Sequence, residues 1–250
     1  MKIPLLANEV IGPPDFVGAG AQRCGTTRWF QLLAQHPEID IPHRYAKQLK
    51  LLGYQMKERR FFARYSCEVP EKLAELYASI FPRVAGKLTG EWTPCYAYEW
   101  WAIPMLAQAA PNTKLLFSVR DPVERYISGV PVTNSCRVPP LIATDAFQRG
   151  LYALQLKHML RYFQRSQILV LQFEKTMIDP VGEMARTCEF LELDPFTPTG
   201  VEEKVNQGRG KKMPLKSLKD DLRASYAEDV SQLVEMVPEL DVKLWLNFRD

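Results

Sequence analysis

The segment 16–27 constrains the fold more than any other part of the sequence. A short apolar run, Phe16–Gly18, leads into a stretch with three glycines that ends at Thr27, and apolar side chains then recur at helical spacing over residues 29–36. Phosphate groups bind at such strand-to-helix turns, because glycines let backbone N–H groups approach the oxygens and the helix N-terminus adds partial positive charge. The segment therefore predicts an anion-binding loop, and a glycine-rich turn without a ligand is the alternative.

The loop departs from the pattern GxxxxGK[ST] that binds nucleoside triphosphates. Gly20 and Gly25 have the expected spacing, but Thr26 occupies the lysine position, and the cation lies three residues earlier, at Arg23. No convincing acidic residue ends a strand to hold magnesium. We therefore expect the loop to hold a phosphate-like group other than the terminal phosphates of ATP, without a metal.

The rest of the chain alternates between short apolar runs and longer helical patterns. The runs at 114–119 (KLLFSV) and 168–173 (ILVLQF) suit buried strands, whereas apolar residues recur with helical period over 70–81, 145–165 and 217–237. Buried strands separated by helices predict an α/β fold of three layers, with a central parallel sheet flanked by helices. With 250 residues, 46% apolar and 24% charged, we expect one soluble domain over 1–250.

A second candidate site follows the run KLLFSV. Arg120 lies directly after it, Pro122 is well placed to open a helix, and Ser128 lies about two helical turns beyond Arg120. In a parallel sheet ligands bind at the carboxyl ends of the strands. A guanidinium and a hydroxyl there can grip one phosphate. The alternative is that Arg120 pairs with a neighbouring carboxylate while Ser128 packs.

The net charge of +3 is concentrated in one stretch. Between Lys204 and Lys219 there are six basic residues and no acidic ones, while the rest of the chain carries 26 basic against 29 acidic side chains. The stretch contains Gly208 and Gly210, which favours a mobile loop over a helix face. We expect this basic loop, near 204–216, to cover an anion, and the alternative is a solvated loop.

Several protein classes are disfavoured by what the sequence lacks. The cysteines are odd in number and widely spread without a CxxC pair, which argues against a zinc site or a disulfide framework. The apolar run at the N-terminus is too short and too rich in proline for a signal peptide, and no run approaches the roughly 18 apolar residues that span a bilayer. We expect a cytoplasmic protein with no membrane span and no bound metal.

Taken together, the motifs resemble those of sulfotransferases that use 3′-phosphoadenosine 5′-phosphosulfate (PAPS). FVGAGAQRCGTTRWFQLLAQHP resembles their 5′-phosphosulfate loop, and LLFSVRDPVERYISG resembles their 3′-phosphate segment. KERRFF and GEWTPCY resemble the KExHFF and GEKTPxY segments of the heparan-sulfate-type and bacterial members, and ILVLQFE with the following DP and FLEL resembles their C-terminal half. The similarity covers roughly residues 14–245. It implies a P-loop-type fold and transfer of sulfonate from PAPS, by in-line displacement, to a hydroxyl of a small-molecule, lipid or sugar acceptor, leaving 3′,5′-adenosine bisphosphate.

The resemblance assigns the nucleotide-binding residues. Arg23 stands where many members have lysine, and since a guanidinium stays charged, we expect it to stabilise charge on the leaving phosphate rather than to donate a proton. The basic loop would cover the nucleotide. The residues expected to bind PAPS are Arg23, Cys24, Gly25, Thr26, Thr27, Arg28, Arg120, Ser128, Arg209, Gly210, Lys211 and Lys212.

The resemblance also proposes a general base. Glu58 matches the glutamate of KExHFF, while Arg60 replaces the usual histidine, and the cations beside Glu58 would weaken it as a base. Two rivals stay open: His43, which falls in an apparent insertion near 40–55, and Glu91. A tryptophan replaces the lysine after Glu91, which suggests a less anionic, flatter or more apolar acceptor. The residues expected at the acceptor are Glu91, Trp92, Tyr96, Arg60 and His43.

Three other functions compete with sulfonate transfer. A P-loop kinase or nucleotide hydrolase predicts the lysine that the loop lacks. A non-catalytic adenine-nucleotide-binding protein would keep the loops and lose the base. Nucleic-acid binding through the basic stretch is weak, since interleaved aromatic residues are absent. The sequence does not choose between a monomer and a homodimer.

Overall fold

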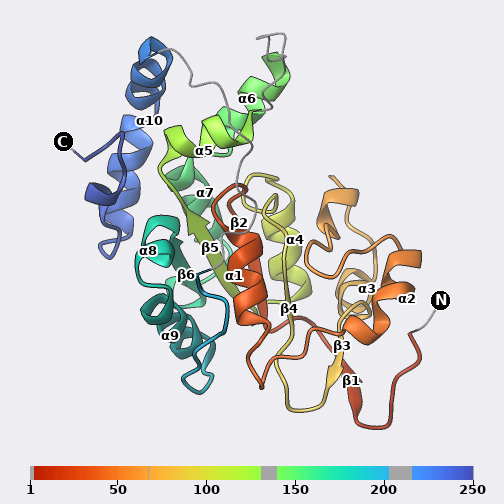
Figure 1. Ribbon diagram of the computed structural model, residues 1–250. Helices are drawn as coiled ribbons and strands as arrows, with labels where there is room; N and C mark the ends of the chain where they lie inside the picture. The colour runs from red at the N-terminus through yellow and green to blue at the C-terminus, as the bar shows by residue number, and fades with distance from the viewer. Residues whose placement is uncertain (1–2, 67, 131–139, 203–215, 250) are drawn as a thin grey trace.

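The computed structural model describes residues 3–66, 68–130, 140–202 and 216–249 (Figure 1). Its strands are β1 (Glu9–Ile11), β2 (Phe16–Gly20), β3 (Pro82–Val84), β4 (Gly90–Trp92), β5 (Lys114–Val119) and β6 (Ile168–Gln172). Its α-helices are α1 (Thr26–Leu33), α2 (Ala46–Leu51), α3 (Leu73–Ala78), α4 (Ala102–Ala109), α5 (Pro122–Gly129), α6 (Pro140–Gln148), α7 (Tyr152–Met159), α8 (Phe173–Ile178), α9 (Pro180–Leu191) and α10 (Lys216–Met236). Short 3₁₀ turns occupy His43–Tyr45, Phe62–Arg64, Arg165–Gln167 and Val242–Leu244.

Four strands form the central sheet, in the order β4-β2-β5-β6, and every neighbouring pair is parallel. Strand β2 lies inside the sheet, with Gly18 opposite Trp92 of β4 on one side and Leu116 of β5 on the other. Strands β1 and β3 form a separate antiparallel pair. The chain leaves β2 directly into the glycine-rich loop, so this loop lies at the carboxyl edge of the sheet.

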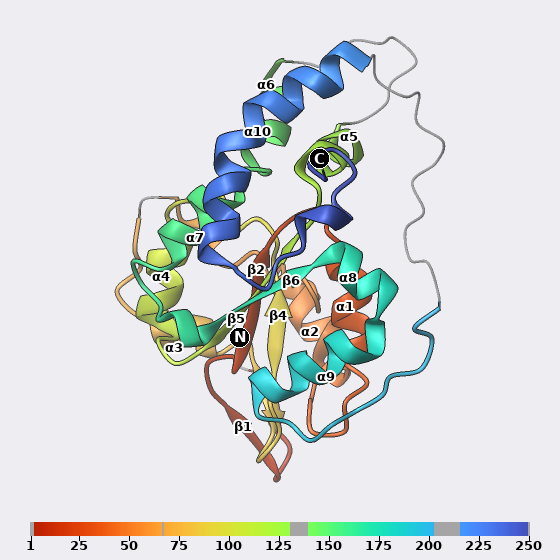
Figure 2. The ribbon, with the colours of Figure 1, turned by 90° about the vertical axis from the view of Figure 1, so that its left-hand side faces the viewer.

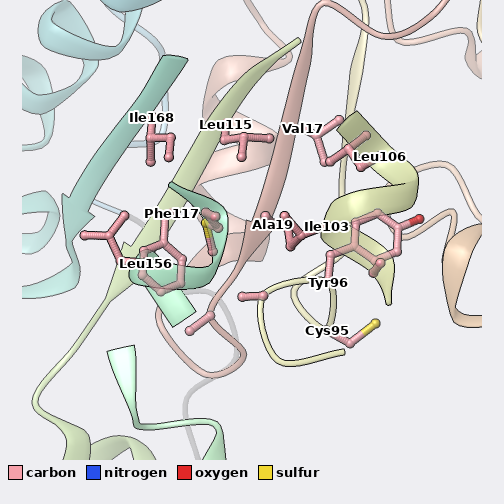
Figure 3. Packing of buried hydrophobic residues seen from close by; sticks show 14 of the residues in the cluster. Val17, Ala19, Cys95, Tyr96, Ile103, Leu106, Leu115, Phe117, Leu156 and Ile168 are labelled. Atoms are coloured by element: carbon pink, nitrogen blue, oxygen red, sulfur yellow. The ribbon is translucent and has the colours of Figure 1, made fainter. Parts of the chain in front are cut away.

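Helices cover both faces of the sheet, which confirms the predicted three-layer α/β fold (Figure 2). Because side chains alternate along a strand, each strand supplies both layers. Val17, Leu115 and Ile168 pack with α4, α7 and α10 (Figure 3). Phe16 and Leu116 face the opposite way and pack with α1 and α9. In the described part of the chain no helix is both long and apolar enough to cross a membrane.

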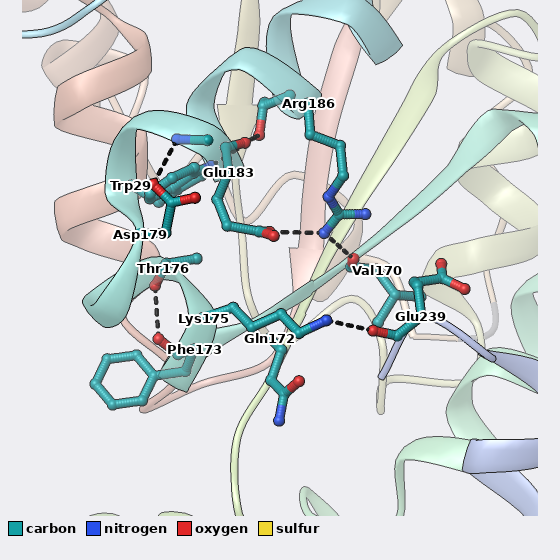
Figure 4. Close-up of polar contacts among 12 residues, drawn as sticks. Trp29, Val170, Gln172, Phe173, Lys175, Thr176, Asp179, Glu183, Arg186 and Glu239 are labelled. Carbon is teal, nitrogen blue, oxygen red and sulfur yellow. Dashed lines mark hydrogen bonds and ion pairs between the residues drawn. The ribbon is translucent and has the colours of Figure 1, made fainter. Parts of the chain in front are cut away.

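Polar contacts fasten α8 and α9 to the sheet (Figure 4). The Asp179 carboxylate accepts the Gly182 N–H at 2.9 Å and so caps α9. Arg186 bridges from Glu183 to the Val170 carbonyl oxygen on β6, at 2.7 and 2.9 Å. The second contact ties α9 to the middle of β6, and α8 begins directly after this strand.

The segment after α10 returns to the carboxyl edge of the sheet. Trp245 is fully buried, and its indole N–H donates to the Glu174 carboxylate on α8 at 2.9 Å. The backbone N–H and side-chain amide of Asn247 both donate to the Asp121 carboxylate, at 3.0 and 2.8 Å. Asp121 precedes α5 and caps it, so residues 245–247 hold together the ends of β5 and β6.

The structure also differs from the predicted elements. The helix predicted over 145–165 is divided into α6 and α7, and the break contains Gly150. A Cβ added to Gly150 would come within 2.8 Å of the Tyr226 hydroxyl oxygen, so α10 packs too closely there for a larger residue. The helix predicted over 70–81 is limited to α3. Strands β1, β3 and β4 were not expected.

Candidate anion-binding and catalytic site

The N-terminus of α1 has backbone N–H groups that no side chain of the described residues caps. By contrast, Asp121 caps α5 and Asp179 caps α9. Gly25 at the start of α1 has φ = 74°, in the left-handed region that glycine adopts without strain. Uncapped N–H groups with the partial positive charge of a helix end form an anion site.

A cavity of about 320 Å³ opens directly above this helix end. It brings together residues from five separate segments of the chain: the loop after β2 with the start of α1, Glu58, Pro94, the end of β5 with α5, and the start of α8. Eight of the residues expected from the sequence line it: Arg23, Gly25, Thr26, Thr27, Arg28, Glu58, Arg120 and Ser128. Residues as far apart in the chain as Gln22 and Phe173 therefore meet where the sequence predicted a ligand.

Arginines from different elements give the cavity its positive charge. Arg23 is exposed and has φ = 72°, so its backbone is held in the left-handed region that a side chain disfavours. The Arg120 guanidinium donates to the Arg23 carbonyl oxygen at 3.4 Å and lies 4.8 Å from the centre of the Phe173 ring. Arg28 is buried, and it donates to the backbone carbonyl oxygens of Thr176 and Val201. Arg28 therefore stabilises the cavity wall through these hydrogen bonds and also adds positive charge to it.

Glu58 brings a carboxylate to the rim of the same cavity. Lys57 Nζ lies 3.1 Å from Glu58 Oε1 and 3.4 Å from the hydroxyl oxygen of Thr26. The side chain of Arg59 turns the other way, because its guanidinium is fully buried 5.2 Å from the centre of the Phe81 ring. The cations expected to crowd Glu58 are thus not grouped around it: Lys57 contacts it and Arg59 lies in the core.

Glu91 lies in the core, away from the cavity. Its carboxylate is fully buried and accepts hydrogen bonds from the Arg59 backbone N–H and from three hydroxyls, those of Thr93, Tyr77 and Tyr96. Burial raises the pKa of Glu91, although these donors lower it in part. The carboxylate therefore holds the segment that carries Glu58 against β4, which is a positioning role.

Three further contacts join the same two segments. The Lys57 carbonyl oxygen accepts the Trp92 N–H at 2.9 Å, the Thr93 hydroxyl accepts the Arg60 N–H at 3.1 Å, and the Tyr96 hydroxyl accepts the Phe61 N–H at 2.8 Å. Each contact pairs one residue of KERRFF with one of GEWTPCY. The two motifs thus form one structural unit that sets the position of Glu58.

The other residues expected at the acceptor do not line the cavity. Trp92 and Tyr96 are both fully buried. The indole of Trp92 packs on Gly18 and donates to the Gly20 carbonyl oxygen at 3.1 Å. Arg60 and His43 are exposed, and His43 begins a 3₁₀ turn before α2. The pleat of β4 and its pairing with β2 direct the side chain of Trp92 into the core.

The structure also reveals cavity residues that the sequence did not single out, namely Gln22, Pro94 and Phe173. Phe173 directly follows β6, as Arg120 directly follows β5. Its position at the end of a predicted strand is therefore the sequence feature that could have identified it as a cavity residue. Its ring closes the space beside Gly25, where an added Cβ would come within 2.7 Å of it. Cys24 is buried beside the Tyr152 hydroxyl, 3.5 Å from Sγ.

Two expectations bear on residues or ligands that the structure does not test. Arg209, Gly210, Lys211 and Lys212 lie outside the described residues. Within the described ranges there is no group of three or more His, Cys, Asp or Glu side chains that could hold a metal ion.

Comparisons with known proteins agree with this geometry. Residues 14–198 match the sulfotransferase family. Over 197 residues, 72% of this chain, the sequence is 32% identical to heparan sulfate glucosamine 3-O-sulfotransferases 6 and 3B1 of Homo sapiens. The matches cover 52% and 46% of those proteins, so the chain spans about half the length of the curated relatives.

Solved structures agree at the level of the fold. The sulfotransferase from Alicyclobacillus acidocaldarius superposes with a TM-score of 0.65 at 23% identity, over 94% of this chain and 99% of that one. Sulfotransferase STF9 from Mycobacterium avium gives 0.51 at 13% identity, over 93% and 78%. With a P-loop-type three-layer fold and a family match over most of its length, the chain belongs to the sulfotransferase family.

Proposed function

We propose that the protein transfers the sulfonate group of PAPS to a hydroxyl by in-line displacement. The observation that carries this proposal is one cavity that combines an uncapped helix N-terminus, the guanidinium groups of Arg23 and Arg120, and the Glu58 carboxylate. The first two features bind a doubly phosphorylated anion, and the third can take a proton from an attacking hydroxyl. Family membership supports the same reaction.

The donor set fits a nucleotide with phosphates at both ends. The amides at the start of α1, with Thr26 and Thr27, would hold the 5′-phosphosulfate, and Arg120 with Ser128 would hold the 3′-phosphate. When bound, PAPS supplies an activated sulfonate on a phosphate leaving group. Arg23 would stabilise the negative charge that the leaving phosphate gains. We keep Arg209, Gly210, Lys211 and Lys212 as proposed contacts to the same nucleotide.

We propose a sugar or small-molecule hydroxyl as the acceptor, and the names of the heparan sulfate relatives support a sugar. The sequence had suggested a flat or apolar acceptor because of Trp92. That indole is fully buried against β2, so it gives no ground for such an acceptor. The cytoplasmic location, the absence of a metal and the choice between monomer and homodimer stay predictions.

Binding of 3′,5′-adenosine bisphosphate tests the proposed nucleotide site. We expect Arg23→Gln and Arg120→Gln each to weaken the binding by roughly 10- to 100-fold, because a hydrogen bond to a charged group contributes about 1.5–3 kcal/mol. Isothermal titration calorimetry at fixed salt measures the change. Arg165→Gln is the matched control, since Arg165 lies elsewhere on the surface and pairs with Glu239.

The outcomes of this titration separate the proposal from its rivals. If the bisphosphate does not bind, or if binding is indifferent to both cavity arginines, the sulfotransferase proposal is wrong. Turnover of ATP with magnesium would favour a kinase or hydrolase instead. A binder that transfers sulfonate from labelled PAPS to none of a broad panel of sugars and small-molecule alcohols would favour a non-catalytic nucleotide-binding protein.

A further inference from the structure

Among the residues that the structure describes, the cations on the cavity wall are strong ones and none of them is an ammonium group. The cations that line it in the described residues, Arg23, Arg28 and Arg120, are all guanidinium groups. A guanidinium stabilises charge but does not release a proton in a protein. A phosphate that leaves from sulfur gains negative charge, and with a second pKa of about 6 it can accept a proton from a nearby donor as that charge develops. The described wall of the site therefore supplies charge stabilisation, and its cations do not supply a proton.

Lys57 stands directly behind the cavity wall. Its ammonium lies 3.4 Å from the Thr26 hydroxyl oxygen, and Thr26 lines the cavity at the start of α1. Thr26 occupies the loop position where nucleoside-triphosphate-binding loops carry their lysine. A lysine from a distant segment thus places its ammonium next to the position from which the loop's own lysine is missing. A hydroxyl can accept one hydrogen bond while it donates another, so Thr26 can connect Lys57 to a bound phosphate.

The same ammonium contacts Glu58 at 3.1 Å, so one lysine touches both the loop and the carboxylate. The side chain of Lys57 is 17% exposed and that of Glu58 is 38% exposed. Burial lowers the pKa of Lys57, and the Glu58 carboxylate opposes this only in part. The other charged side chains that line the cavity in the described ranges are Arg23, Arg28 and Arg120, which also favour the neutral amine.

We infer that Glu58, Lys57 and Thr26 form a proton relay from the acceptor hydroxyl to the leaving 5′-phosphate. The inference rests on the proposed sulfonate transfer. The acceptor oxygen forms a bond to sulfur, and the bond between sulfur and the bridging phosphate oxygen breaks, with its electron pair going to the phosphate. Glu58 takes the hydroxyl proton, and Lys57 passes a proton through Thr26 to the phosphate. Transfer from Glu58 to Lys57 then restores both groups, so the acceptor loses one proton and the nucleotide product gains one.

Proton uptake on binding of 3′,5′-adenosine bisphosphate tests the lysine without an acceptor. Calorimetry in buffers of different ionisation enthalpy counts the protons taken up between about pH 8 and pH 10, where the phosphates are fully ionised and free lysine has a pKa of about 10.4. We expect the native protein to take up protons, because the anion favours the charged form of Lys57. Burial raises the pKa of the Cys24 thiol to about 12, so it does not titrate in this range.

Variants identify the group that titrates. Lys57→Met keeps the chain length and Lys57→Arg keeps the charge, and both should abolish the uptake. Lys72→Met is the matched control, because Lys72 also pairs with a glutamate, Glu75 at 3.8 Å, but on an exposed helix end. Thermal melting checks that each variant folds. Binding without uptake in the native protein, or uptake that survives Lys57→Met, overturns the relay while the proposed function stands. Absence of any binding overturns the proposed function itself.

Turnover of PAPS, measured with an acceptor found in the panel of sugars and alcohols, distinguishes a role of Lys57 in proton transfer from a role of its charge alone. We expect Lys57→Arg to bind the bisphosphate nearly as tightly as the native protein but to turn over roughly 100-fold more slowly, which is the range of general acid–base catalysis. Thr26→Ser should keep most of the turnover because it keeps the hydroxyl, whereas Thr26→Val should lose it. Lys57→Arg with native turnover would mean that Lys57 acts by charge alone, and the relay would be rejected.

Discussion

Replacing Trp92 with alanine is expected to lower the free energy of unfolding by about 3–5 kcal/mol, the usual range for a buried tryptophan. The indole is fully buried on β4, it lies against Gly18, and it donates to the Gly20 carbonyl oxygen. The substitution would leave a cavity between two strands and a buried carbonyl without its donor. For a chain of this size the melting temperature should fall by roughly 6–20 °C.

Thermal and urea unfolding measure this effect. Trp100→Ala is the matched control, because Trp100 is 44% exposed and its loss should cost less than about 1 kcal/mol. Trp92→Phe keeps a ring but loses the hydrogen bond, so we expect an intermediate loss of stability. If Trp92→Ala melted like the native protein while the Michaelis constant for an acceptor changed, the indole would act at the acceptor and its place in the core would be wrong.

Replacing Glu58 with glutamine is expected to slow PAPS turnover by roughly 10²–10⁴-fold, the contribution of a positioned general base. Glutamine has nearly the same shape but cannot take the proton of the attacking hydroxyl. Affinity for 3′,5′-adenosine bisphosphate should be unchanged or slightly higher, because the substitution removes a negative charge from the cavity rim. Transfer of labelled sulfonate and calorimetry measure the two quantities separately.

The control for this substitution is Glu75→Gln, which removes the carboxylate of an exposed lysine–glutamate pair. It should alter neither turnover nor nucleotide affinity. Native turnover in Glu58→Gln would exclude Glu58 as the base and would also break the relay through Lys57. Weaker nucleotide binding with native turnover would instead point to a role of Glu58 in holding the donor.

Strands β5 and β6 could be predicted because their sequences are mostly apolar. The runs at 114–119 and 168–173 became β5 and β6, and the glycine-rich loop after β2 marked the start of α1. Strand β4 escaped prediction because it is short and carries Glu91 in its middle. That carboxylate is tolerated inside the sheet because the Arg59 backbone N–H and the hydroxyls of Tyr77, Thr93 and Tyr96 donate to it. Two of the donors, the Tyr77 hydroxyl and the Arg59 N–H, lie 14 and 32 residues from Glu91, so they give no local pattern in the sequence.

The same distinction between local sequence pattern and tertiary contacts applies to the candidate site. Residues that belong to a strand end or a helix start, such as Arg23, Thr26 and Arg120, line the cavity as expected. Whether Trp92 faces the ligand or the core depends on the pairing of β4 with β2, which the sequence does not reveal. The surroundings of Glu58 depend on tertiary contacts in the same way: Arg59 is buried beside the Phe81 ring, whereas Lys57 contacts Glu58.

The contacts of residues 245–247 make completion of the nucleotide site a late event in synthesis. The glycine-rich loop and Arg120 emerge early, but Asp121 and Glu174 receive their donors from Asn247 and Trp245. Residues 245–247 are synthesised after every element of the sheet, and they supply the donors that join the ends of β5 and β6. A chain that stops before Trp245 would lack these donors, and we expect its proposed nucleotide site to be more loosely held.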